Sequence, residues 1–338
     1  MRKSTIRTNP VHRIPCKACD LVPRLPLIFK NTRFTLRTGT PTIHPHSLAR
    51  LMLFTTCSTK NNLGEPMSFE EISLFILLLC AAGLIAGITA GLFGNGGGFV
   101  VVPALLAVFP FLHSASDEMM RVAVGTSLAS IVISSARSVQ AHSKRGAVDF
   151  KVLRDWSIWI VLGVGAGLYI ASFTDSKSLI YVFAGGVLLY SIYFLFPNLF
   201  DGLKGKLEMP TGFARASLAS FLGGFSSLLG IGGGTITVMT MVLCNRPAHQ
   251  AVATASGIGF LIGLPGAIGF LLMGLGAPDL PIGSIGYINV PALIAISIFS
   301  IISAPIGARW AHSLNELHLK RLFGVYLIAV SMAMFAKA

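Results

Sequence analysis

Long apolar runs separated by short polar segments fill most of the chain after residue 71. Six stretches carry no charged residue, and a seventh, 122–143, is interrupted only by Arg137. A helix needs about 20 mostly apolar residues to cross a bilayer. The pattern therefore predicts an all-α polytopic membrane protein. The six charge-free stretches are 72–116, 156–174, 178–200, 216–245, 247–278 and 280–308, and a shorter apolar run, 322–336, follows them.

Two of these runs are too long for one helix, and each is broken by glycines. The breaks read Gly94-Asn95-Gly96-Gly97-Gly98 and Gly230-Ile231-Gly232-Gly233-Gly234. The apolar run after each break has about 10–14 residues, a length that suits a re-entrant or short-span segment. We predict a Gly-broken helical hairpin over 72–112 and another over 213–245.

The chain also repeats itself. An offset of 136 aligns the two glycine breaks, and an offset of 128 aligns Ala123-Val124-Gly125-Thr126 with Ala251-Val252-Ala253-Thr254. An offset of 140 aligns Gly146-Ala147-Val148-Asp149 with Gly286-Tyr287-Ile288-Asn289. Because the matches occur in the same order, we expect two copies of one unit. Each copy is a hairpin and three spans: 121–142, 155–174 and 178–198, then 248–275, 288–309 and 321–336.

Three crossings after a hairpin would place the second copy upside down. Lys and Arg concentrate on the cytoplasmic side of membrane proteins. With the 143–154 loop inside, the outer side holds only Arg121, Lys177 and Lys337. The inverted arrangement therefore agrees with the charge pattern. The inner set is Lys144, Arg145, Lys151, Arg154, Lys204, Lys206, Arg215, Arg246, Arg309, Lys320 and Arg321.

Composition supports a membrane protein and locates the charge. Apolar residues make up 53% of the chain and charged residues 12%, against about 25% charged in soluble domains. The net charge of +13 is concentrated in residues 1–66, which hold eleven Lys and Arg but only Asp20 and Glu65. The apolar body therefore gives no reason to expect nucleic-acid binding. Cys16 and Cys19 have the spacing of half a zinc site without a second half, so no metal and no cofactor are predicted.

The basic N-terminal extension, residues 1–66, has three interpretations. Its composition fits a cleaved transit peptide, a disordered tail, or a segment upstream of a native start at Met67, which we favour. The expected organisation is this extension, a first transmembrane repeat over 67–200, a cytoplasmic linker over 201–212 and a second repeat over 213–338.

Several motifs resemble those of the sulfite exporter TauE/SafE family. They are GLFGNGGGFVVVPAL at 91–105, AVGTSL at 123–128, SLLGIGGGTITVMTMVL at 227–243, PIGARWAHSL at 305–314 and LKRLFGVYL at 319–327. The resemblance spans 72–336 and implies an integral membrane permease for sulfite, sulfoacetate or related organosulfur anions. The two copies differ, since Ile231 and Thr235 stand where the first copy has Asn95 and Phe99.

The glycine breaks are the predicted substrate-binding site. Glycines allow close approach to a ligand and positive φ, and a helix that starts after a break directs free N–H groups and a positive dipole end at an anion. Transporters with inverted repeats bind substrate where such broken helices meet. The candidates are Gly96, Gly97, Gly98, Gly232, Gly233 and Gly234. Close helix packing is the alternative role of these glycines.

Polar residues near the breaks are further substrate-binding candidates. Asn95 offers an amide donor, or serves as a left-handed turn residue. Thr126, Ser127, Thr254 and Ser256 either line the path or bond backbone within their helices. Arg137 either holds an oxyanion with its guanidinium fork or extends to the inner surface, as charged side chains near a membrane boundary do.

The sequence thus predicts a permease of the cell (inner or plasma) membrane that exports a small anion by alternating access. Its partners are the lipid bilayer and a small anionic substrate. No catalytic residue is found, so an enzyme is not expected. Alternatives are a membrane enzyme acting on a sulfur compound and an anion channel.

Overall fold

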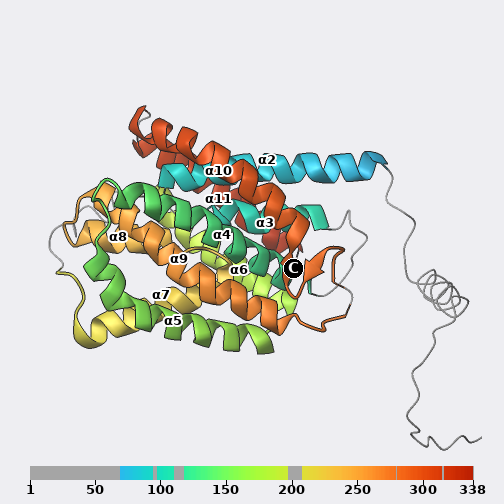
Figure 1. Cartoon of the computed structure of the whole chain (residues 1–338), viewed down its shortest axis with the longest axis horizontal. Coiled ribbons are helices and arrows are strands. Elements are labelled where there is room, and N and C mark those ends of the chain that lie inside the picture. The colour runs from blue at the N-terminus through green and yellow to red at the C-terminus, as the bar shows by residue number, and fades with distance from the viewer. Residues whose placement is uncertain are drawn as a thin grey trace, which may run out of the picture. The chain divides into compact units, whose positions relative to one another are not determined.

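The structure is a computed structural model that describes residues 69–93, 97–109, 118–196, 208–278, 280–313 and 316–337. The described residues form helices and one two-stranded sheet (Figure 1). The helices are α2 (Phe69–Phe93), α3 (Gly98–Val108), α4 (Met119–Ser143), α5 (Phe150–Phe173), α6 (Ser176–Leu195), α7 (Gly212–Leu229), α8 (Gly234–Leu243), α9 (Ala248–Met273), α10 (Val290–Ser313) and α11 (Glu316–Lys337). Strands β1 (Ser284–Ile285) and β2 (Ile288–Asn289) pair antiparallel.

Seven of the described helices are long and apolar enough to cross a membrane: α2, α4, α5, α6, α9, α10 and α11. The prediction of a polytopic all-α membrane protein is confirmed. The outer faces carry exposed large apolar side chains, such as Leu77, Leu162 and Leu189. Apolar surface on this scale suits contact with lipid rather than with water.

Local sequence explains where several helices begin. The side chain of Asp149 accepts hydrogen bonds from the N–H groups of Lys151 and Val152 and so caps α5. Asp175 accepts from the N–H of Ser178 and caps α6. Hydrogen bonds from Ser178 hold the pKa of Asp175 below its usual value. Such caps satisfy N–H groups that lack partners within the helix.

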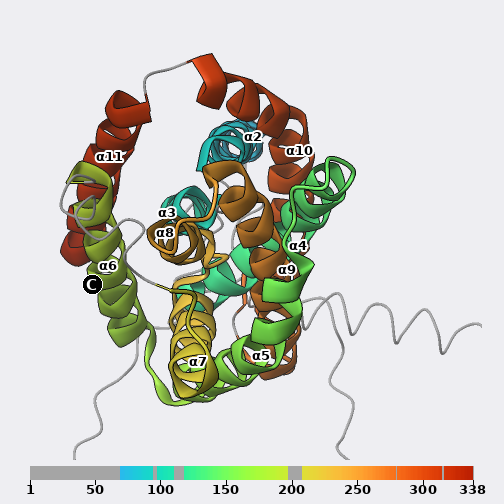
Figure 2. The ribbon, with the colours of Figure 1, turned by 90° about the vertical axis from the view of Figure 1, so that its left-hand side faces the viewer.

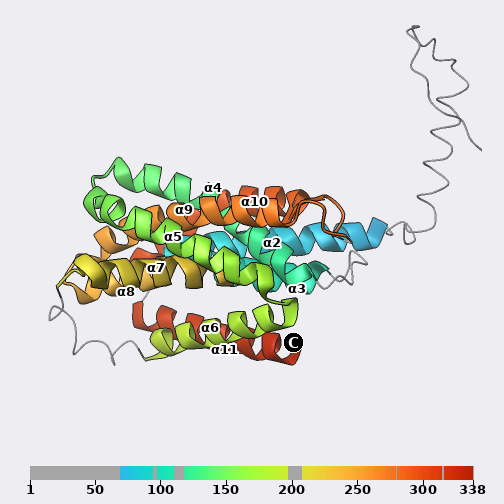
Figure 3. The same ribbon diagram turned by 90° about the horizontal axis from the view of Figure 1, so that it is seen from below.

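Helices α4 and α9 pack against each other and run in opposite directions. Asp149 lies beside the start of α9, and Asn289 lies beside the start of α4. These two residues define the Asp149 end and the Asn289 end of the bundle. Figure 3 shows α6 and α11 as a neighbouring pair at the side of the other helices.

The broken hairpins enter the bundle from opposite ends. Helix α2 runs parallel to α10, because Gly83 packs on Ile296 and Gly307 packs on Ile88. Since α10 starts at the Asn289 end, α2 enters from there. Helix α7 runs parallel to α5 and enters from the Asp149 end, where Arg215 pairs with Asp155 at 3.2 Å.

Glycines allow these parallel pairs to pack closely. A methyl group at Gly167 would lie 2.6 Å from the Gly224 carbonyl oxygen, and one at Gly223 would lie 2.3 Å from that of Ile160. Such distances leave no room for a Cβ, so α5 and α7 approach backbone to backbone. Gly163 packs in the same way, whereas Gly165 faces open space.

We expect Gly167→Ala to lower the thermal unfolding midpoint of the detergent-purified chain. The added methyl forces α5 and α7 apart, and overpacking of this kind costs about 1–3 kcal/mol. Gly165→Ala, two residues away on the same helix, is the matched control and leaves the midpoint unchanged or slightly raised, because alanine favours helix. Equal midpoints for both variants would contradict this packing.

Candidate functional site

The two glycine breaks meet inside the bundle. A methyl group at Gly98, the first residue of α3, would lie 2.5 Å from the carbonyl oxygen of Gly230 and 3.0 Å from the Cα of Ile231. The Ser127 hydroxyl of α4 donates to the same Gly230 oxygen at 2.7 Å. The two glycine breaks, which the sequence aligns at an offset of 136, are therefore in direct contact. We call this meeting point of residues 97–98 and 230–234 the break site.

Positive φ angles explain why glycines occupy the breaks. Gly97 precedes α3 with φ 78° and Gly233 precedes α8 with φ 65°, both left-handed conformations that other L-residues rarely adopt. Gly230 ends α7 in the same conformation, and the N–H groups of Gly230 and Ile231 bond back to Ser227 and Ser226. This is the usual way in which a glycine closes a helix.

Two helix N-termini therefore point into the same interior region. Figure 2 shows α3 and α8 overlapping in an end view, with longer helices around them, while Figure 1 places them toward opposite ends. The N–H groups of a first helical turn have no acceptor within their helix. Together with the helix dipole, they form an environment that attracts an anion.

The structure brings some of the predicted glycines together. Gly97, Gly98, Gly233 and Gly234 all lie at the starts of α3 and α8. The carbonyl oxygen of Gly232 lies close to Gly259 of α9. Asn95 and Gly96 lie outside the described residues.

The predicted threonines connect segments that the sequence assigns to different repeats. The Thr126 hydroxyl accepts a hydrogen bond from the N–H of Asn289 at 2.9 Å, and the Thr254 hydroxyl accepts one from the N–H of Asp149 at 2.9 Å. Both threonines are fully buried. The two bonds are equivalent by the sequence alignment, because Thr126 aligns with Thr254 and Asn289 aligns with Asp149, and one bond lies at each end of the bundle. These hydroxyls hold α4 and α9 to the turns opposite them.

The remaining candidates lie near the Asp149 end. Ser256 shares a hydrogen bond with Ser138 at 2.8 Å, which joins α9 to α4. The side chain of Arg137 is exposed, and its guanidinium lies 3.4 Å from the Gln140 amide oxygen. The structure thus leaves Arg137 on the outside of α4 rather than bringing it to the break site.

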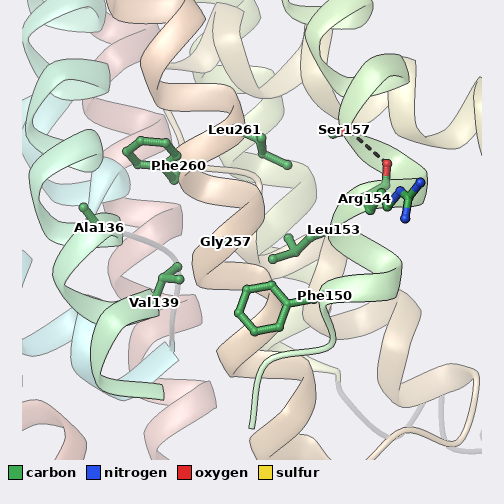
Figure 4. Close-up of a pocket in the computed structure, with 9 residues that line it drawn as sticks. All are labelled: Ala136, Val139, Phe150, Leu153, Arg154, Ser157, Gly257, Phe260 and Leu261. Carbon is green, nitrogen blue, oxygen red and sulfur yellow. Dashed lines mark hydrogen bonds between the residues drawn. The ribbon is translucent and has the colours of Figure 1, made fainter. Parts of the chain in front are cut away.

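A groove between α4, α5 and α9 lies toward the Asp149 end (Figure 4). It has a volume of about 560 Å³ and an almost entirely apolar lining. Phe150, Leu153, Phe260 and Leu261 project around it, while Figure 4 shows the Arg154 guanidinium directed away from the middle of the groove. An apolar lining does not compensate the desolvation of an ion, so the groove is not a candidate anion site.

Charged side chains of the helix ends pair with one another. Arg121 binds Glu118 through its guanidinium and donates to the Thr174 carbonyl oxygen at 2.6 Å, so it ties the start of α4 to the turn before α6. Its guanidinium carbon also lies 5.9 Å from the centroid of the Tyr287 ring. Burial raises the pKa of Tyr287. Among the residues that the structure describes, no group of three or more His, Cys, Asp or Glu is placed to hold a metal ion.

Three buried hydroxyls at the second break were not singled out from the sequence. Ser226 of α7, Thr235 of α8 and Tyr190 of α6 are each at least nine-tenths buried. Apart from a contact between the Tyr190 and Ser226 hydroxyls, the three oxygens have no hydrogen-bond partner among the described residues. The sequence contains one indication of these hydroxyls: Thr235 stands in the second copy at the position where the first copy has Phe99.

The long apolar helices around paired helix breaks are those of an integral membrane transporter. The family model described as "Sulfite exporter TauE/SafE" matches residues 79–334. The chain belongs to this family of membrane permeases. No solved structure is significantly similar to it.

Three relatives carry the description "probable membrane transporter protein". One from Haemophilus influenzae is 34% identical over 269 residues, which cover 78% of this chain and 99% of the relative. One from Methanocaldococcus jannaschii is 28% identical, over 78% of this chain and 97% of the relative. The protein YunE of Bacillus subtilis is 30% identical, over 59% of this chain and 79% of its own length.

We expect Ser127→Ala to destabilise the break site. The change removes a donor from the buried Gly230 carbonyl, and an unsatisfied buried acceptor costs about 1–3 kcal/mol. Thermal unfolding of the purified chain measures the loss. Ser130→Ala is the matched control, because the Ser130 hydroxyl bonds a carbonyl of its own helix, that of Ser127. A larger loss for Ser130→Ala than for Ser127→Ala would contradict the assignment.

Proposed function

We propose that the protein is a permease that moves a small oxyanion, sulfite or a sulfonate, across the cell membrane by alternating access. The observation that carries this proposal is the convergence of the α3 and α8 N-termini at the break site. The N–H groups of a helix start bind sulfur and phosphorus oxyanions without a paired cation. The family description supplies the sulfur chemistry of the cargo.

The mechanism rests on two repeats related by an axis in the membrane plane. Helices α2 and α7 enter the bundle from opposite ends, which supports this symmetry, because one hairpin would then open toward each side of the membrane. Equivalent contacts support it further. Gly87 packs on the Ser300 carbonyl, and Gly223 packs on the Ile160 carbonyl. The two contacts are equivalent, because Gly87 aligns with Gly223 at an offset of 136 and Ile160 aligns with Ser300 at an offset of 140.

Alternating access then follows from the symmetry. Residues of both repeats form the break site, and a Thr–backbone hydrogen bond lies on each side of it: Thr254 to Asp149, and Thr126 to Asn289. Loosening one bond while keeping the other would open the site to one side only. An inside-negative potential favours outward movement of an anion by about 2.3 kcal/mol per charge per 100 mV, so export needs no coupled ion.

Flux measurements test the transport function. The full chain in proteoliposomes should release sulfite or sulfoacetate with saturable kinetics, faster under a potential that is negative inside. Gly233→Ala should reduce the flux about tenfold, since an alanine in the left-handed conformation costs about 1–2 kcal/mol at the start of α8. Gly165→Ala is the matched control and keeps the wild-type rate.

The kinetics also separate the alternatives. Flux that does not saturate would identify a channel, and conversion of the anion by the purified chain would identify an enzyme. Absence of flux for both anions, from protein that elutes as a single folded species, would overturn the proposal.

The inverted arrangement has its own test. Arg145 and Ile285 are equivalent at an offset of 140, and both side chains are exposed. We expect Ile285→Cys to react with a membrane-impermeant maleimide in intact cells, and Arg145→Cys to react only after permeabilisation, in a background whose native cysteines are replaced by serine. Labelling of both positions from the same side would contradict the inversion.

A further inference from the structure

Three buried hydroxyls gather at the start of α8. A methyl group at Gly233, the residue before α8, would lie 3.0 Å from the Ser226 oxygen, so this hydroxyl is directed at the helix start. The Tyr190 hydroxyl lies beside that of Ser226. Thr235 is the second residue of α8. Apart from the contact between Tyr190 and Ser226, their oxygens have no hydrogen-bond partner among the described residues, although their side chains are buried.

Other buried hydroxyls of this region are satisfied. Thr237 donates to the Gly233 carbonyl at 3.0 Å, and Ser227 donates to that of Gly224 at 2.8 Å. Buried polar groups without partners are rare in proteins, and each carries a desolvation cost. Three such hydroxyls lie around one helix start, whose first N–H groups have no acceptor within the helix. This arrangement indicates that a ligand supplies the missing acceptor.

The other broken helix shapes this region without adding donors. The ring of Phe99, in the first turn of α3, packs edge-on against Tyr190, with ring centroids 4.8 Å apart and an interplanar angle of 79°. Phe99 is fully buried. The first repeat therefore holds the tyrosine ring in place, and its hydroxyl is left facing Ser226 and the second break.

The repeat shows that this polar cluster exists only once. The residues equivalent to Ser226 and Thr235 at an offset of 136 are Ala90 and Phe99, and the residue equivalent to Tyr190 at an offset of 140 is Val330. None of these three has a hydroxyl. The two halves of the break site are therefore chemically different: the second offers donors and the first offers apolar surface.

The charge of the ligand follows from what surrounds the cluster. Helix α8 has no charged side chain, and those of α6 and α7 are Lys177 and Arg215, both in the first turns. The cluster thus contains neutral donors only. The cost of removing an ion from water rises with the square of its charge, so neutral donors recover a larger share of that cost for a monoanion than for a dianion.

On the basis of the proposed function, we infer that Tyr190, Ser226 and Thr235, with the N–H groups at the start of α8, bind the oxygen atoms of a singly charged oxyanion such as a sulfonate or hydrogensulfite. Its non-oxygen side would face the apolar half formed by Phe99. Doubly charged oxyanions of the same size would bind poorly.

The test measures binding to the purified full chain by isothermal titration calorimetry. The probe is methanesulfonate, which has one charge and an apolar methyl group, and sulfate is the doubly charged comparison. We expect methanesulfonate to bind at least about tenfold more tightly than sulfate. Ser226→Ala, Thr235→Val and Tyr190→Phe should each weaken methanesulfonate binding about 10- to 100-fold, the value of one hydrogen bond to a charged group.

Thermal unfolding without ligand distinguishes this role from a structural one. Removal of an unpaired buried hydroxyl should leave the midpoint unchanged or raise it. The matched control, Thr237→Val, removes a hydroxyl that is already bonded within α8, so it should lower the midpoint and leave methanesulfonate affinity unchanged.

Three results would overturn the inference: no methanesulfonate binding to the wild-type chain, equal or tighter binding of sulfate, or unchanged affinity in all three variants. Unchanged affinity in the variants together with normal wild-type flux would reject this cluster and leave the transport function standing. Binding that depends on the cluster without flux of any anion would reject the transport function alone.

Discussion

A helix that ends inside a bilayer must have its backbone polar groups satisfied by the protein, because lipid offers no hydrogen bonds. This constraint accounts for the centre of the molecule. At the second break, Gly230 and Ile231 bond back into α7, and Ser127 of α4 reaches the Gly230 carbonyl. The longer helices around the breaks thus provide the hydrogen bonds that water would provide elsewhere. The close approach of α3 to Gly230 requires glycine at position 98.

The small polar side chains divide into two groups according to this constraint. Those of Thr126, Ser127 and Thr254 are committed to backbone groups of other segments and so maintain the architecture. Those of Ser226 and Thr235 are equally buried but uncommitted. A hydroxyl that already has its partner gives up a bond when it binds a ligand, whereas an uncommitted one gains a bond. The second group is therefore the better source of affinity.

The sequence predicted the helices well, because length and apolar content are strong signals in a membrane protein. The span predicted over 121–142 corresponds to helix α4, Met119–Ser143, and the span predicted over 155–174 corresponds to helix α5, Phe150–Phe173. The short strands at Ser284–Ile285 and Ile288–Asn289 were missed, since four residues interrupted by a turn leave no periodic pattern. The predicted span 288–309 accordingly starts later, at Val290.

The candidate site was only partly predictable. Glycine runs identified the breaks, because other L-residues rarely adopt the positive φ angles found there. The partners of the hydroxyls could not be read from the chain. Thr126 and Asn289 are 163 residues apart, and nothing local to either residue indicates the bond. Tyr190 stands in an apolar run where an aromatic residue is unremarkable, and its position beside Ser226 exists only after folding.

The parallel pairs of helices have a consequence for synthesis. Helix α5 meets its partner α7 soon after both are made, but the glycine face of α2 packs on α10, more than 200 residues later in the chain. At about 5–20 residues per second, α2 and its break wait on the order of 10–40 s in the membrane before that partner is complete. During that interval the nascent chain exposes a small-residue face and open backbone to lipid and to other newly inserted helices. Biogenesis of this fold therefore favours a chaperoning insertion site that retains α2 until the last third of the chain has arrived.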